Sequence, residues 1–166
     1  LVPLLLQAGH EVTVLSRDRS KLRDVPWQGQ VKILEGSIED ASAARALCSG
    51  AEVLYYLVHS MSGEHGPASN FERVERLCAL NAGRAAREAG VGRLVYLSGL
   101  HPQGRLSRHL ASRTEVGEIL LASGTPTVVL QAGLVIGSGS ASFEMVRHLT
   151  DVLPVMPAPK WVMNKI

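Results

Sequence analysis

The stretch RLVYLSGL, residues 93–100, decides the fold of this chain. After one basic residue it continues through an apolar and aromatic run, residues 94–97. Such a run is typical of a strand that is buried on both faces in the middle of a parallel sheet. The run ends at Ser98 and Gly99, and ligands of open α/β sheets gather at the carboxyl ends of the strands. The sequence therefore predicts a site at Ser98.

Outward from this stretch, strand-like and helix-like segments alternate along the chain. Runs rich in branched and apolar residues predict strands over 11–17, 31–35, 52–58 and 127–131. Helical spacing of apolar residues and helix-ending glycines predict helices over 1–8, 41–49, 71–89, 106–122 and 142–150. Because helices between parallel strands make right-handed crossovers, the alternation predicts an α/β fold. We expect a doubly wound parallel sheet with helices on both faces.

The composition is that of one ordinary globular domain. The chain has 166 residues, of which 46% are hydrophobic and 19% charged, and its formal net charge is +2. A charge this small argues against nucleic-acid binding. No apolar window reaches the ~18 residues that a membrane span needs, and residues 1–6 lack the length and the basic lead of a signal peptide. Cys48 and Cys78 lie in helical patterns typical of reduced core residues, so we expect a cytoplasmic protein.

Ser16 and Arg17 end the predicted strand over residues 11–17 and mark a second candidate position. In a dinucleotide-binding sheet, the residue after the second strand meets the adenosine ribose. An acid there favours a free 2′-hydroxyl, and an arginine favours a 2′-phosphate. A guanidinium also matches phosphate with bidentate geometry. Arg17 therefore favours NADP over NAD, and a solvated basic turn is the alternative interpretation.

Three phrases, in this order, resemble one known family: GHEVTVLSR at 9–17, GVGRLVYLS at 90–98 and VIGSGS at 135–140. They look like the NmrA-like, atypical branch of the extended short-chain dehydrogenase/reductases. The phrases at 112–120 and 143–145 are similar to bacterial members that carry an extra C-terminal domain of unknown function. The resemblance covers nearly the whole chain.

The resemblance implies a Rossmann domain that binds NAD(P) over residues 1–150, followed at 151–166 by the start of a truncated substrate-side segment. It places the family's first strand and glycine-rich turn upstream of Leu1. The chain begins without methionine and already in a helix-like pattern. We therefore expect a fragment of a longer protein, whose fold lacks its first strand.

The resemblance also implies which residues contact the cofactor. The phrase at 36–40 matches the family's adenine-contacting turn and contributes Ser37 and Ile38, with Ser37 in place of the usual acid. The third predicted strand would run beside the cofactor at its end, with Leu57, Val58 and His59, and Ser98 would also lie on the cofactor side, next to the nicotinamide. His59 is alternatively a free surface residue. Asn81 is implied to brace strand ends, or is a tolerated polar residue on an apolar helix face.

The family's catalytic motif, Tyr-x-x-x-Lys, is changed in this chain. In the family the tyrosine is the acid/base, the lysine lowers its pKa, and a serine matching Ser98 polarises the carbonyl. The matching helix carries His109 and Arg113 instead, at the same spacing on one helix face. His109 can transfer protons near neutral pH, whereas Arg113 can pair with an anion but cannot relay protons. Three interpretations stay open: catalysis by His109, dinucleotide binding without efficient chemistry, and a solvated polar face.

Two functions of different classes follow. The first is an oxidoreductase-like protein that passes a hydride between NADP, or alternatively NAD, and an unidentified small carbonyl or alkene. The second is a non-catalytic dinucleotide-binding regulator that reports the redox ratio to a partner protein. The sequence predicts no metal site in either case.

Overall fold

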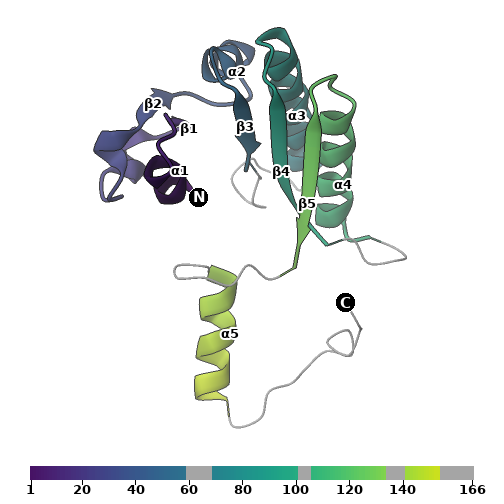
Figure 1. Ribbon diagram of the computed structural model, residues 1–166. Coiled ribbons are helices and arrows are strands. Elements are labelled where there is room, and N and C mark those ends of the chain that lie inside the picture. Colours follow the sequence, from purple (N-terminus) through teal and green to yellow (C-terminus); the bar gives the residue numbers. More distant parts are fainter. Residues whose placement is uncertain (59–68, 101–105, 134–140, 154–166) are drawn as a thin grey trace. The chain divides into compact units, whose positions relative to one another are not determined.

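A computed structural model of the chain describes residues 1–58, 69–100, 106–133 and 141–153 (Figure 1). Its elements are α1 (Val2–Gln7), β1 (Thr13–Ser16), the 3₁₀ turns η1 (Arg19–Leu22) and η2 (Gln28–Gln30), β2 (Lys32–Glu35), α2 (Ala41–Cys48), β3 (Val53–Tyr56), α3 (Ser69–Glu88), β4 (Arg93–Gly99), α4 (Arg108–Leu121), β5 (Thr127–Ala132) and α5 (Ala141–Val152). The chain divides into two compact units, Leu1–Gln131 and Ala132–Ile166. The predicted division after residue 150, into a cofactor domain and a substrate-side segment, stays a prediction.

The strands of the first unit form two short sheets. β1 pairs with β2 in parallel, from Thr13 opposite Lys32 to Ser16 opposite Glu35. In the second sheet β4 lies between β3 and β5, and β3 runs parallel to β4. The predicted α/β fold with parallel strands is confirmed, and β4 is the middle strand of its sheet. Among the described strands, β1 and β3 are not hydrogen-bonded to each other, so the expected single sheet is divided there.

The burial of β4 differs from the prediction. Leu94, Tyr96 and Ser98 alternate along the strand and are at most 3% exposed. Leu94 and Tyr96 belong to the same hydrophobic core as residues of α3 and α4, and Figure 1 shows these two helices beside the sheet. Leu97 points to the other side and is 37% exposed, so the prediction of a strand buried on both faces is wrong for the described residues. The run is apolar at every position, and its pattern therefore does not reveal which face a helix covers.

Helices α3 and α4 pack against each other through small residues. Ala79, Ala82 and Ala86 of α3 are fully buried in the core, which Leu120 of α4 also joins. At Gly83 the approach is close enough that an added Cβ would lie 2.8 Å from the Cβ of Ser123. This packing explains why the helical spacing in the sequence predicted both helices.

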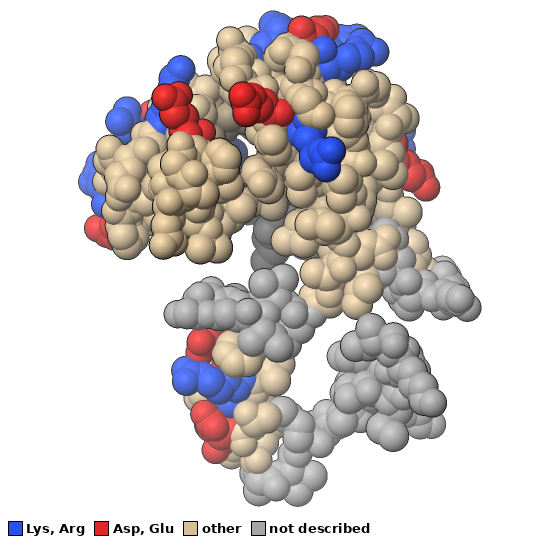
Figure 2. Space-filling model, in the orientation of Figure 1, with Lys and Arg blue, Asp and Glu red and all other residues tan. Residues whose placement is uncertain are grey.

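The surface shows mixed charge. On the face drawn in Figure 2, Lys and Arg side chains are interspersed with Asp and Glu, and wide areas carry neither. None of the described helices is both long enough and apolar enough to cross a membrane.

Candidate functional site

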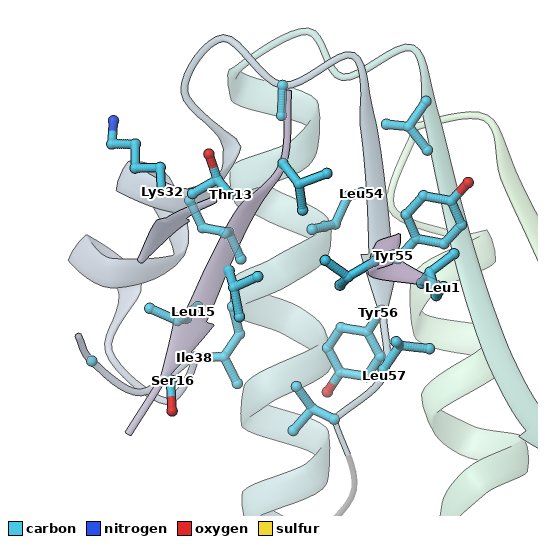
Figure 3. Close-up of a pocket in the computed structure, with 18 of the residues that line it drawn as sticks. Leu1, Thr13, Leu15, Ser16, Lys32, Ile38, Leu54, Tyr55, Tyr56 and Leu57 are labelled. Atoms are coloured by element: carbon cyan, nitrogen blue, oxygen red, sulfur yellow. The ribbon is translucent and has the colours of Figure 1, made fainter. Parts of the chain in front are cut away.

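A cavity of about 1140 Å³ lies in the first unit, between the sheet of β1 and the sheet of β3 (Figure 3). Its walls include predicted cofactor residues from three separate segments: Ser16, Arg17, Ser37, Ile38, Leu57 and Val58. His59 lies outside the described residues. The structure thus brings together around one cavity six of the seven described residues that were predicted to contact a dinucleotide, and the seventh, Ser98, does not line it.

The two strands beside the cavity run in the same direction. In Figure 3, Thr13, Leu15 and Ser16 follow one another along β1 in the sense in which Leu54 to Leu57 follow along β3. The carboxyl ends of both strands therefore lie at the same end of the cavity, where ligands of parallel sheets bind. Along its length between the strands the wall is largely apolar, with Val14, Leu5 and Leu54.

The segment after β1 is held by local hydrogen bonds. Ser16 Oγ donates to the carbonyl oxygen of Asp18 at 2.9 Å. Asp18 in turn caps η1, because its carboxylate accepts from the Ser20 backbone N–H at 2.8 Å. Hydrogen bonds from the side chain and then the backbone of Ser20 lower the pKa of Asp18. Arg17 lies between these two fixed residues and lines the cavity together with Lys21.

The turn after β2 is braced from α3. Asn81 Nδ2 donates to the carbonyl oxygens of Ile38 and Glu39, at 3.1 and 2.8 Å. Ser37 Oγ accepts from the backbone N–H of Glu39 at 3.3 Å. The interpretation of Asn81 as a brace is confirmed for this turn, and the brace holds Ser37 and Ile38 at the cavity wall.

The cavity also contains residues that the sequence did not single out. Tyr56 of β3 and Cys78 of α3 line it, although they are only 3% and 2% exposed. Burial raises the pKa of Tyr56, and the nearby Cys78, Tyr96 and Glu75 raise it further. The sequence signals for these two residues are the alternating pattern of β3 and the apolar stripe of α3. Both patterns also mark ordinary core residues, so they do not indicate a cavity. Cys48 and Cys78 are both buried free thiols, as predicted.

The three candidate catalytic residues are not among the residues that line this cavity. Ser98 is 3% exposed, and its Oγ has no hydrogen-bond partner in the described part of the chain. The ring of His109 is exposed on one side and stacks on Phe71, with ring centroids 4.8 Å apart. The carbonyl oxygen of Arg113 accepts a hydrogen bond from the Tyr96 hydroxyl at 3.4 Å. Their joint role as a catalytic group stays a prediction.

The described residues contain no group of three or more His, Cys, Asp or Glu side chains that could hold a metal ion. A parallel α/β unit with polar residues at the carboxyl ends of its strands instead fits an organic ligand.

Comparison with known proteins gives the family. The chain matches the protein family described as NAD(P)H-binding over residues 1–132. It belongs to that family. The match covers all five strands that the structure describes and the cavity, so nicotinamide dinucleotide is the cofactor class of this Rossmann-like domain.

Known relatives are similar over part of their length. The 3 beta-hydroxysteroid dehydrogenase/Delta 5-->4-isomerase of Mycobacterium tuberculosis is 32% identical over 104 residues, which are 59% of this chain and 27% of that protein. The structure of Bordetella bronchiseptica WbmH in complex with NAD+ is similar with a TM-score of 0.66 and 20% identity, over 90% of this chain and 57% of that one. The corresponding values for Citrobacter sp. triphenylmethane reductase complexed with NADP(H) are 0.60 and 16%, over 84% and 45%. The chain thus spans about a quarter of the curated relative and about half of these structures, which share its fold.

Proposed function

We propose that this protein is an NADP-binding oxidoreductase-like member of the NmrA-like, atypical short-chain dehydrogenase/reductases. Bound cofactor would supply a hydride for an unidentified small substrate. The observation that carries the proposal is the convergence of Ser16, Ser37 and Leu57, from three segments, on one end of one cavity. Solved relatives of the same fold contain NAD+ or NADP(H), which supports the cofactor class. A cytoplasmic location stays a prediction from the sequence.

The donors at the cavity fit a dinucleotide phosphate. In the proposed complex the Arg17 guanidinium holds the 2′-phosphate, since it lies directly after β1 at the cavity wall. Ser37 and Ile38 contact the adenine, and Asn81 keeps their turn in place. Leu57 and Val58 provide an apolar wall beside the rest of the cofactor.

The part of the cavity that lies between β1 and β3 has a separate proposed role. A strand placed there in parallel would hydrogen-bond to the edges of β1 and β3 that have no described partner. We propose that the strand which the family resemblance places ahead of Leu1 occupies this position. Leu1 itself lines the cavity, so a segment joined to it lies within reach.

The test of cofactor choice is a fluorescence titration of the full-length protein with NADPH and NADH. We expect tighter binding of NADPH, and Arg17→Ala should weaken it about tenfold, equivalent to about 1.4 kcal/mol, without changing NADH binding. Arg23→Ala is the matched control, because Arg23 carries the same charge but does not line the cavity. Equal affinities for the two cofactors, or an unchanged Arg17→Ala variant, would overturn the assignment of NADP.

A second function, a non-catalytic regulator that binds NAD(P) and signals to a partner protein, is favoured by the state of the candidate catalytic groups. Ser98 Oγ is buried, and Ser98, His109 and Arg113 are not among the residues that line the cavity. The usual Tyr and Lys of the family's catalytic motif are replaced by His109 and Arg113.

A panel of small carbonyl compounds and NADPH separates the two functions. If the protein is a reductase that uses His109, NADPH is consumed and His109→Ala abolishes the consumption. NADPH binding without consumption across the panel supports the regulator. Consumption that survives in His109→Ala removes this residue from the mechanism.

A further inference from the structure

Several side-chain contacts join α3 to α4 along their length. His109 stacks on Phe71, Arg108 pairs with Glu72 at 2.9 Å, Ser112 Oγ donates to Glu75 Oε2 at 2.5 Å, and Arg76 pairs with Glu115. The two ion pairs are exposed, with side chains between 34% and 58% accessible. Such pairs contribute little to the geometry of a fold.

The contact between Ser112 and Glu75 is different because it is buried. Ser112 is 4% and Glu75 is 6% exposed, although both are polar. A buried carboxylate is strongly destabilising unless hydrogen bonds compensate for the lost water. A rotation or shift of α4 that removed the Ser112 hydroxyl from Glu75 would therefore be unfavourable.

The contacts of α4 with the sheet include a longer hydrogen bond, in which the Tyr96 hydroxyl donates to the carbonyl oxygen of Arg113 at 3.4 Å. Close apolar contacts lie beside it, since a Cβ added at Gly117 would meet Val129 and Tyr96 at van der Waals distance and one added at Gly99 would lie 3.1 Å from Leu110. Contacts of this kind depend on shape and tolerate small rotations of a helix. The buried bond between Ser112 and Glu75 joins α4 to α3 and adds a short, directional restraint on the rotation of α4 about its own axis.

We propose that Glu75 is a positioning residue, which through Ser112 holds α4 in the rotation that presents His109 and Arg113. Ser112 precedes Arg113 directly and follows His109 by three residues, so one bond controls both. Glu75 also lies next to Val74, which lines the cavity, on the helix whose Asn81 braces the adenine-side turn. The catalytic importance of this positioning rests on the proposed function. The structural role of Glu75 in holding α4 does not depend on it.

The test uses the full-length protein and the ring protons of His109 in NMR spectra. Stacking on Phe71 shifts these protons upfield, and Phe71→Leu shows the size of that effect. We expect Glu75→Met and Ser112→Ala each to lose at least half of the shift. Glu75→Gln should retain it, because the amide oxygen can still accept from Ser112. Glu115→Gln, at an exposed ion pair, is the matched control and should change nothing.

Circular dichroism identifies any variant that fails to fold. If Glu75→Met does not fold, Ser112→Ala, which removes only the hydroxyl oxygen, decides whether the hydrogen bond positions His109. A His109 signal that is unchanged in folded Ser112→Ala and Glu75→Met overturns the proposal. A loss in Glu75→Gln as large as in Glu75→Met also overturns it, because the hydrogen bond would then not be the cause.

Dinucleotide binding gives an independent measurement. NADPH affinity should stay within about twofold of wild type in Ser112→Ala, because the cavity residues come from elements other than α4. Failure of the wild-type protein to bind NADPH would contradict the proposed function alone, since the NMR result still decides the role of Glu75. If the protein is a reductase, its turnover of NADPH should fall at least tenfold in Ser112→Ala and stay near the wild-type value in Glu75→Gln.

Discussion

Cys78 carries a thiol whose proton is held tightly by its surroundings. The side chain is 2% exposed, and burial, followed by the charges of Glu39 and Glu75, raises the pKa of Cys78 from 9.0 to about 12, while Arg17 lowers it. The positive charge of Arg17, at the cavity wall, thus acts on the thiol of Cys78 in α3. The neutral thiol is the favoured form in the folded protein.

This raised pKa predicts a loss of stability in alkali. The unfolded chain releases the Cys78 proton near pH 9, whereas the folded chain holds it until about pH 12. The stabilising contribution is complete below pH 9 and is lost as the pH rises through that window. We expect the melting temperature to fall between about pH 9 and pH 11, and to fall less steeply in Cys78→Ala. Parallel curves for the two proteins would contradict the assignment.

Among single residues, those at strand ends could be predicted and those covered by helices could not. Arg17 and Ser37 follow strands, and strand ends of a parallel sheet meet at one edge, so their proximity follows from the pattern. Ser98 lies near the carboxyl end of β4, yet its hydroxyl is buried. Its neighbours in β4 are apolar on both sides, so no alternation reveals the direction of its side chain.

At the scale of elements, the helices α3 and α4 depend on a close approach at Gly83. Gly83→Ala would place a Cβ 2.8 Å from the Cβ of Ser123, so α3 or the turn that directly follows α4 would have to shift. We expect the free energy of unfolding to fall by about 1–3 kcal/mol, the usual effect of overpacking. Gly29→Ala is the matched control, because a Cβ there meets nothing within 4 Å. Urea unfolding of both variants measures the difference, and an equal effect at the two sites would refute this account of the interface.

The elements themselves followed from the sequence, and their pairing did not. Helical spacing predicted 71–89 and 106–122, and the structure has α3 at Ser69–Glu88 and α4 at Arg108–Leu121. Local spacing carries this information because a helix bonds within itself. Strand neighbours are set by contacts between distant segments. The separation of β1 from β3 therefore has no signature in either strand.

At the scale of the whole molecule, the divided sheet predicts how dinucleotide binding depends on chain length. β1 and β3 both line the cavity but do not pair with each other. Among the described strands, each has a hydrogen-bonded neighbour on one side only, so the strand ends beside Arg17 and Leu57 are held from that side. We expect the 166-residue chain to bind NADPH poorly, and a longer chain with the residues encoded ahead of Leu1 to bind at least tenfold more tightly. In the longer chain, hydrogen exchange at Leu15 and Tyr55 should slow, because their backbone amides face away from β2 and β4 and a strand between β1 and β3 would protect them. Micromolar binding by the 166-residue chain, or exchange that the extension leaves unchanged, would show that the cavity is complete without such a strand.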